Sequence, residues 1–272
     1  MARKPVVAGQ FYPANPKDLR DTIESFTPEV EGKERALGVL SPHAGYTFSG
    51  AAAGAAFAAV RVPDTVLLLN PSHSYAAPAL ALWTGGPWQT PLGETALDEP
   101  LTSALAELPA VTSDDRPHLH EHSGEVVLPF VQYHNPKARL AVVCVTASAG
   151  FEMLQDFGAA VAELLGREGM VETLIVTSSD MSHESGSGAL ETVNHNDPLA
   201  IERMDALDAA GLYDVCRRGG VTMCGVLPAV AMLTAVKALG GTQGVLVRRA
   251  TSADSPFGSG SYVVGYAGMI FK

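Results

Sequence analysis

Short, continuous apolar segments recur along the chain and alternate with longer segments of helical character. Strands that are apolar throughout are typical of a parallel sheet covered on both faces, and their alternation with helices indicates an α/β fold. We predict strands at residues 37–40, 66–69, 79–83, 140–145, 174–177, 245–249 and 262–266. We predict helices at residues 17–25, 50–60, 99–108, 125–133, 151–167, 198–209 and 225–239. The sequence therefore predicts a mostly parallel central sheet flanked by helices.

The length and the composition suit one compact domain. The chain has 272 residues, of which 47% are hydrophobic and 17% charged, so it can bury a large core. No Pro/Ser-rich linker or block of charge divides it, and we predict a single domain over residues 1–272. Two polar stretches, residues 84–98 and 113–123, are predicted to be long surface loops, which are often part of functional sites.

The charge balance excludes two classes of partner. Lys and Arg number 18 against 29 Asp and Glu, which leaves a net charge of -11. Nucleic acids and anionic membranes both require clustered basic residues, so neither is expected to be a partner. The sequence has no apolar run of the roughly 20 residues that cross a membrane, no secretory leader and no CxxC pair. We therefore expect a cytoplasmic protein.

Three histidines follow predicted strands directly. His43, His73 and His183 each lie a few residues beyond an apolar run, in a short turn that contains Ser, Pro or Asp. The carboxyl ends of parallel strands meet at one edge of a sheet, where ligands bind. A single such histidine is usually held by hydrogen bonds to the backbone. Three at equivalent positions predict a metal site or an acid–base site.

Cys224 is a fourth candidate. It precedes the predicted helix 225–239, where the helix dipole would stabilise a thiolate, a soft metal ligand and a nucleophile. The alternative is a small buried residue, which is the common role of a free cysteine. Cys144 lies within a predicted strand and belongs to the core, and Cys216 has no motif around it.

The segment 118–122 carries three histidines at alternate positions. We interpret His118 and His120 as part of a solvated loop. His122 leads into the helix that contains Glu125, so Glu121 and His122 are predicted to contact a substrate in the same crevice. The sequence lacks GxxxxGK[ST], GxGxxG after the first strand, GxSxG and HExxH, which argues against the corresponding nucleotide-binding, hydrolase and metalloprotease classes.

Six ordered motifs resemble the Memo family, called AmmeMemoRadiSam system protein B in bacteria and archaea. They are PVVAGQFYP (5–13), SPHAGY (41–46), PSHS (71–74), EHSGE (121–125), SSDMSH (178–183) and CGVLP (224–228). The resemblance spans nearly the whole chain. It implies a fold like that of the LigB-type class III extradiol dioxygenases, which are α/β proteins with a non-haem iron site.

The resemblance also implies roles for individual residues. His43, His73 and Cys224 would be metal ligands, and Asp180 and His183 would form the neighbouring catalytic pair. A cysteine in place of a carboxylate favours softer ions, so we expect Fe(II) or Cu(I), with Zn a further option. Ring cleavage is not expected of such a site.

Two functions follow. The first is a metal-dependent redox enzyme that acts on an unknown small molecule or peptide, with His183 as general acid or base. The second is a non-catalytic interaction module on the same fold, whose partners would be an AMMECR-type protein and a radical SAM protein.

Overall fold

Four parallel strands form the middle of the sheet. The computed structural model describes residues 2–167 and 172–272. Within it the parallel strands lie side by side in the order β1 (Gly38–Ser41), β8 (Thr173–Ser178), β2 (Thr65–Pro71) and β7 (Arg139–Val145). Their pairing is in step, so that all four end at the same edge of the sheet. The predicted parallel core is confirmed.

Antiparallel strands extend this core on both sides. On one side β11 (Tyr262–Phe271) pairs with β1, and β10 (Gly244–Thr251) forms the edge. On the other side β3 (Leu80–Leu82) pairs antiparallel with β7 and parallel with β6 (Val111–Ser113). The short β9 (His183–Ser185) pairs with β11, and β4 (Trp88–Thr90) forms a separate hairpin with β5 (Gly93–Thr95).

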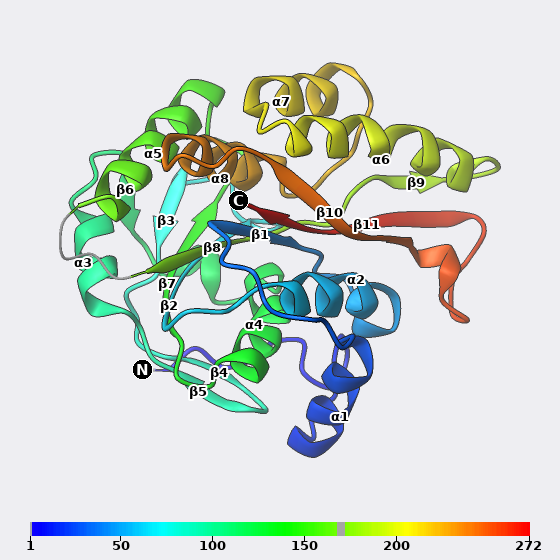
Figure 1. Ribbon diagram of the computed structural model, residues 1–272, viewed down its shortest axis with the longest axis horizontal. Coiled ribbons are helices and arrows are strands. Elements are labelled where there is room, and N and C mark those ends of the chain that lie inside the picture. The colour runs from blue at the N-terminus through cyan, green and yellow to red at the C-terminus, as the bar shows by residue number, and fades with distance from the viewer. Residues whose placement is uncertain (1, 168–171) are drawn as a thin grey trace.

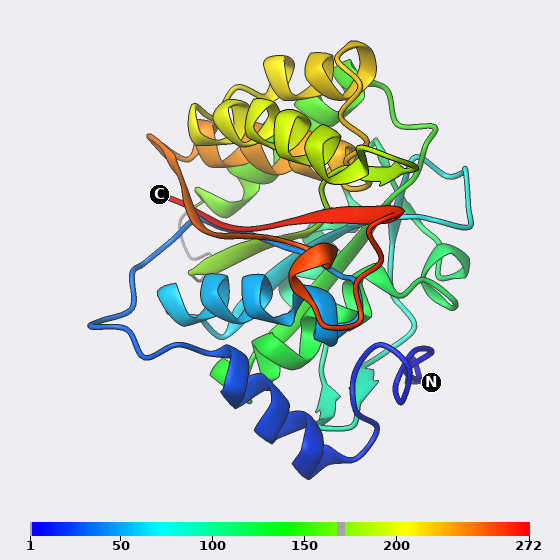
Figure 2. The ribbon, with the colours of Figure 1, turned by 90° about the vertical axis from the view of Figure 1, so that its right-hand side faces the viewer.

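Helices cover both faces of the sheet (Figures 1 and 2). One layer holds α5 (Phe151–Leu165), α6 (Ala189–Asp205), α7 (Ala209–Arg218) and α8 (Val226–Ala238). The other holds α1 (Pro16–Phe26), α2 (Tyr46–Ala59) and α4 (Ser123–His134), while α3 (Glu99–Ala106) packs beside β3, β6 and β7. The described part of the chain also contains the 3-10 turns η1 (Arg116–His118) and η2 (Ser252–Asp254).

The apolar strands are buried because each faces a helix layer on both sides. Leu67 and Leu69 of β2 belong to the core beneath α5 and α8, whereas Val66 and Leu68 belong to the core beneath α2 and α4. Successive residues of a strand point to opposite faces, so both sets must be apolar. This double burial explains why the strands read as continuous runs.

Three predictions were wrong. The stretch 84–98 is not a surface loop throughout, since it contains the β4–β5 hairpin and Trp88 is 1% exposed. Helix α6 begins at Ala189, nine residues before the predicted start, because Pro198 lies inside the helix rather than at its first turn. Helix α7 was not predicted. The stretch 113–123 is not a solvated loop throughout: His118 is 0% exposed, and its ring packs against Trp83 and Trp88. Those aromatic neighbours lie far away in the sequence, so the local polar pattern gave no sign of them.

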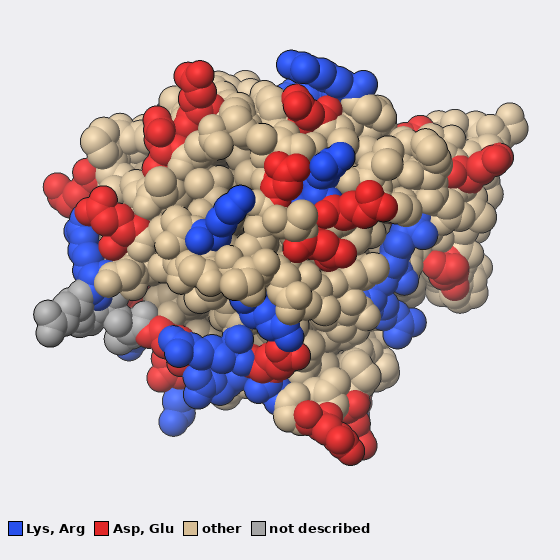
Figure 3. Space-filling model, turned by 45° about the horizontal axis from the view of Figure 1, so that its top comes forward, with Lys and Arg blue, Asp and Glu red and all other residues tan. Residues whose placement is uncertain are grey.

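Acidic and basic side chains are both found on the surface of the molecule. Figure 3 shows acidic and basic side chains interspersed over one face of the molecule. Within the described chain, Glu172 pairs with both Arg35, at 3.0 Å, and Arg61, at 2.8 Å. Among the described residues, no helix has the length and apolar character that a bilayer crossing requires.

One prediction concerns the packing of α1 on α2. A Cβ atom at Gly54 would overlap the carbonyl oxygen of Phe26, the last residue of α1. Ala in a helix interior normally gains about 1 kcal/mol over Gly, but overpacking a backbone contact costs about 1–3 kcal/mol. We expect Gly54→Ala to lower the free energy of unfolding, measured by urea denaturation. Gly260→Ala, where a Cβ would meet nothing within 4 Å, is the control.

Candidate metal centre

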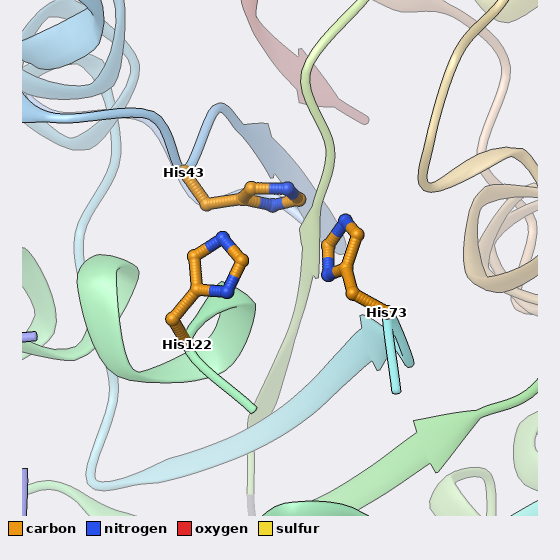
Figure 4. Close-up of side chains that lie close together, drawn as sticks. All are labelled: His43, His73 and His122. Carbon is orange, nitrogen blue, oxygen red and sulfur yellow. The ribbon is translucent and has the colours of Figure 1, made fainter. Parts of the chain in front are cut away.

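Three imidazoles converge beyond the carboxyl ends of the parallel strands. His43 follows β1, His73 follows β2, and His122 directly precedes α4. One ligand nitrogen from each lies within 4.8 Å of the other two, and the ring centroids are 4.9–5.5 Å apart. Figure 4 shows the three rings facing a common space. This is a geometry that could hold one metal ion.

A buried serine sets the tautomer of His43. The Ser178 hydroxyl donates to the carbonyl oxygen of Ser123 at 2.7 Å, so its oxygen is left to accept from Nδ1–H of His43 at 2.6 Å. The Nε2 atom of His43 therefore keeps its lone pair. His43 is 2% exposed, and burial holds its pKa well below the usual range. A neutral imidazole is the form that binds metals.

Glu121 orients His73. One carboxylate oxygen accepts from Nδ1–H of His73 at 2.9 Å and the other from the His73 backbone N–H at 2.6 Å. Burial would raise the pKa of Glu121, but hydrogen bonds and the charge of His73 lower it to about 2. The hydrogen bond to Glu121 raises the pKa of His73. A carboxylate behind a histidine ligand fixes the ring and leaves Nε2 for the metal.

The third imidazole is held by its neighbours on both sides. His122 Nδ1 lies 3.4 Å from Glu121 Oε1, and Phe11 packs edge-on against the ring with centroids 5.1 Å apart. Burial lowers the pKa of His122. Glu121 thus contacts the rings of both His73 and His122.

Cys224 lies beside this cluster. Its Sγ is 3.3 Å from Nε2 of His43, the nitrogen that Ser178 leaves free, and it accepts from the Asp180 backbone N–H at 3.2 Å. Burial, with the nearby Asp180 carboxylate, raises the pKa of the Cys224 thiol. Without a cation the sulfur is therefore a neutral thiol rather than the predicted thiolate. A bound metal would reverse this preference.

Asp180 lies on the loop after β8, and His183 is the first residue of β9. Asp180 Oδ1 accepts from the backbone N–H groups of His43 and Ala44 at 2.8 and 3.2 Å, and burial raises its pKa. His183 donates from Nδ1 to the Met181 carbonyl at 3.0 Å. Its Nε2 atom is then an acceptor at the wall of the cavity.

A cavity of about 440 Å³ opens over the cluster. The three histidines, Asp180 and His183 form its polar wall, and its other walls are mainly aromatic. These aromatic residues are Phe11, Phe48, Phe257, Tyr262 and Tyr266. None of the described lining residues is Lys or Arg. The cavity therefore suits a neutral or cationic molecule with an apolar body.

The structure brings most of the predicted site residues together. His43, His73, Asp180 and His183 line one cavity, with Cys224 in contact with His43. His122 was predicted to contact a substrate, and it lies in the metal-binding cluster as well as in the cavity wall. Glu121 was given the same role, but it is 1% exposed and both of its oxygens are engaged. The substrate roles of both residues remain predictions.

Fold and site together define a class: an α/β protein with a three-histidine candidate metal centre at the carboxyl ends of its parallel strands. The family model described as Memo-like protein matches residues 3–270. A MEMO1 family protein of Methanopyrus kandleri is 39% identical over 100% of this chain and 99% of its own length. One from Aquifex aeolicus is 36% identical over 99% and 98%. This chain belongs to the Memo family.

The fold has a solved counterpart. The crystal structure of an uncharacterized protein from Escherichia coli K12 covers 85% of this chain and 99% of its own, with a TM-score of 0.52. At 14% sequence identity the likeness concerns the fold alone.

Replacing the orienting carboxylate should weaken the centre. Glu121→Gln keeps the shape of the side chain but removes the charge behind His73. Outer-shell changes of this kind cost roughly 10–100-fold in metal affinity. We expect that loss in a competition titration with Zn(II) or Co(II). The exposed Glu163→Gln is the control, and equal affinities for the two variants would contradict the role of Glu121.

The ionisation of Glu121 should also affect the stability of the metal-free protein. Because the pKa of Glu121 lies at about 2 in the fold against an ordinary 4.5, its ionisation stabilises the protein above pH 4.5. That contribution disappears as the pH falls toward 2. The wild type should therefore lose more unfolding free energy than Glu121→Gln between pH 4.5 and 2, measured by denaturation at several pH values. Parallel curves would contradict the lowered pKa.

Proposed function

We propose that this Memo family protein is a metal-dependent oxidoreductase that binds one iron or copper ion at the cluster described above. The observation that carries the proposal is the convergence of three imidazole nitrogens within 4.8 Å, with a cysteine sulfur 3.3 Å from one of them. Imidazole suits iron, copper and zinc, and a thiol favours Cu(I), Zn or thiolate-bound iron. His43 and His73 would be ligands, joined by Cys224, by His122 or by both.

These side chains suit a metal ion because the Nδ1 atoms of His43 and His73 already have hydrogen-bond partners within the protein. Ser178 and Glu121 each accept a ring N–H, so Nε2 of His43 and Nε2 of His73 are the nitrogens that would bind an ion. Among the residues that the structure describes, the cluster consists of three histidines without a carboxylate, so the centre differs from the two-histidine, one-carboxylate sites of iron oxygenases. A bound iron or copper ion would supply one-electron redox chemistry.

The chain itself would bind the substrate and move a proton. The aromatic walls bury an apolar body, and the lack of described Lys or Arg in the lining disfavours phosphorylated or carboxylate substrates. His183 Nε2 is placed to accept a proton from a hydroxyl or thiol group in the cavity. Asp180 holds the His43 backbone in place and lies in the same wall.

Anaerobic reconstitution tests the proposal. We expect one Fe(II) or Cu(I) per chain, with Zn(II) as a redox-inactive comparison, and then oxygen uptake that depends on an added phenol or thiol. His183→Ala should keep the metal and lose about 10²–10⁴-fold in turnover, as general acid–base residues do. Metal binding with no turnover over a broad panel would instead favour the interaction module with AMMECR-type and radical SAM partners.

Cys224→Ser tests the ligand set, with Cys216→Ser as the matched control. Cys216 is a free, partly buried cysteine on α7 and does not line the cavity. Losing a direct ligand should cost at least the roughly 10–100-fold that an outer-shell change costs. A Cys224→Ser protein with full affinity would remove the sulfur from the ligand set and leave the three histidines.

A further inference from the structure

We propose that Arg3 is a positioning residue that holds His122 at the metal centre. Arg3 lies 119 positions from His122 in the chain and does not line the cavity. The inference rests on the proposed metal centre, and it assigns a role in that centre to a residue outside it.

The Arg3 guanidinium group donates hydrogen bonds to the turn that leads to His122. Its Nε donates to the carbonyl oxygen of His118 at 2.9 Å, and its Nη2 donates to the carbonyl oxygen of Glu121. These two carbonyls belong to the short segment that ends directly before His122. Arg3 is 2% exposed and lies over the ring of Trp88, 4.2 Å from its centroid. A buried group with five fixed donors defines the path of this turn.

An ion pair fixes the guanidinium in turn. Arg3 Nη1 donates to Glu125 Oε2 at 2.8 Å, and Glu125 is 0% exposed. Glu125 lies in the first turn of α4, three residues after His122. Arg3 thus binds the chain on both sides of His122, through carbonyls before it and a carboxylate after it.

Glu125 ties the whole N-terminal segment to the same place. Its carboxylate also accepts from the backbone N–H groups of Val6 and Val7, at 2.8 and 2.9 Å, and from the Tyr12 hydroxyl at 2.7 Å. The segment then returns to the centre through Phe11, whose ring packs against His122. The Arg3–Glu125 pair therefore controls both the backbone before His122 and one wall beside its ring.

Lysine cannot replace arginine here. A lysine ammonium can neutralise Glu125, but as a compact point charge it cannot reproduce the planar fork that meets two carbonyls and a carboxylate. Arg3→Lys therefore separates the charge from the positioning. Arg3→Met removes both and leaves a buried carboxylate without its partner, which is strongly destabilising. The lysine variant keeps the test valid if the methionine variant fails to fold.

The decisive experiment is a double-mutant cycle on Zn(II) and Co(II) affinity. We expect Arg3→Lys to weaken binding about 10–100-fold in the wild-type background, as other outer-shell changes do. In a His122→Ala background the same change should cost less than about threefold, because the residue it positions is gone. The Co(II) absorption spectrum should change in Arg3→Lys and match that of His122→Ala more closely than that of the wild type.

Arg139→Met is the matched control. It breaks an ion pair with Asp98, which is 2% exposed, at the amino end of β7, away from the cavity. Its metal affinity should stay within about twofold of the wild type. A folded Arg3→Lys protein with wild-type affinity would overturn the proposal. So would an equal loss in the His122→Ala background, or an equal loss in Arg139→Met.

A metal-free measurement separates this inference from the proposed function. Hydrogen exchange of the 118–123 peptide should quicken in metal-free Arg3→Lys, while β2 and β8 keep their protection. If the wild type binds no metal, the proposed centre fails, and the exchange result alone decides whether Arg3 holds the turn. Unchanged exchange in 118–123 would show that it does not.

Discussion

Parallel pairing in step is the constraint on which the site depends. The register of β1, β8, β2 and β7 is such that all four strands end at the same edge of the sheet. The residues that follow β1, β2 and β8 then meet without any long side chain having to reach across, and this brings His43, His73 and Asp180 to one cavity.

Hydrogen bonds to the Nδ1 atoms of His43 and His73 determine how these rings can act in the cavity. Ser178 accepts from His43 and Glu121 accepts from His73, so in each of these two rings Nε2 is the nitrogen left for an ion. Burial works in the same direction at His43 and His122, whose pKa values are lowered. Asp180 and Glu121 orient the histidines through hydrogen bonds. The result is a nitrogen-rich site next to one sulfur.

The parts of the site that depend on strand ends could be predicted from the sequence, and the parts that depend on packing could not. His43 and His73 were identifiable because each lies in a proline-containing turn that directly follows an apolar run. His122 was placed near the crevice, but its place in the metal cluster depends on the start of α4. Arg3 and Glu125 gave no local signal, since the contacts that link Arg3 to His118 and to Glu125 join residues more than 110 positions apart. The burial of His118 was missed because Trp83 and Trp88, which pack against it, are also distant in the sequence.

The spread of the donors along the chain has a consequence for biosynthesis. His43 and His73 emerge early from the ribosome, but His122 needs α4, and Cys224 directly precedes α8, which is made late. Contacts of such high sequence separation form slowly and only when most of the fold is in place. A nascent chain would offer isolated imidazoles and no pocket. An ion held by Cys224 together with the histidines would therefore be acquired only after translation is nearly complete.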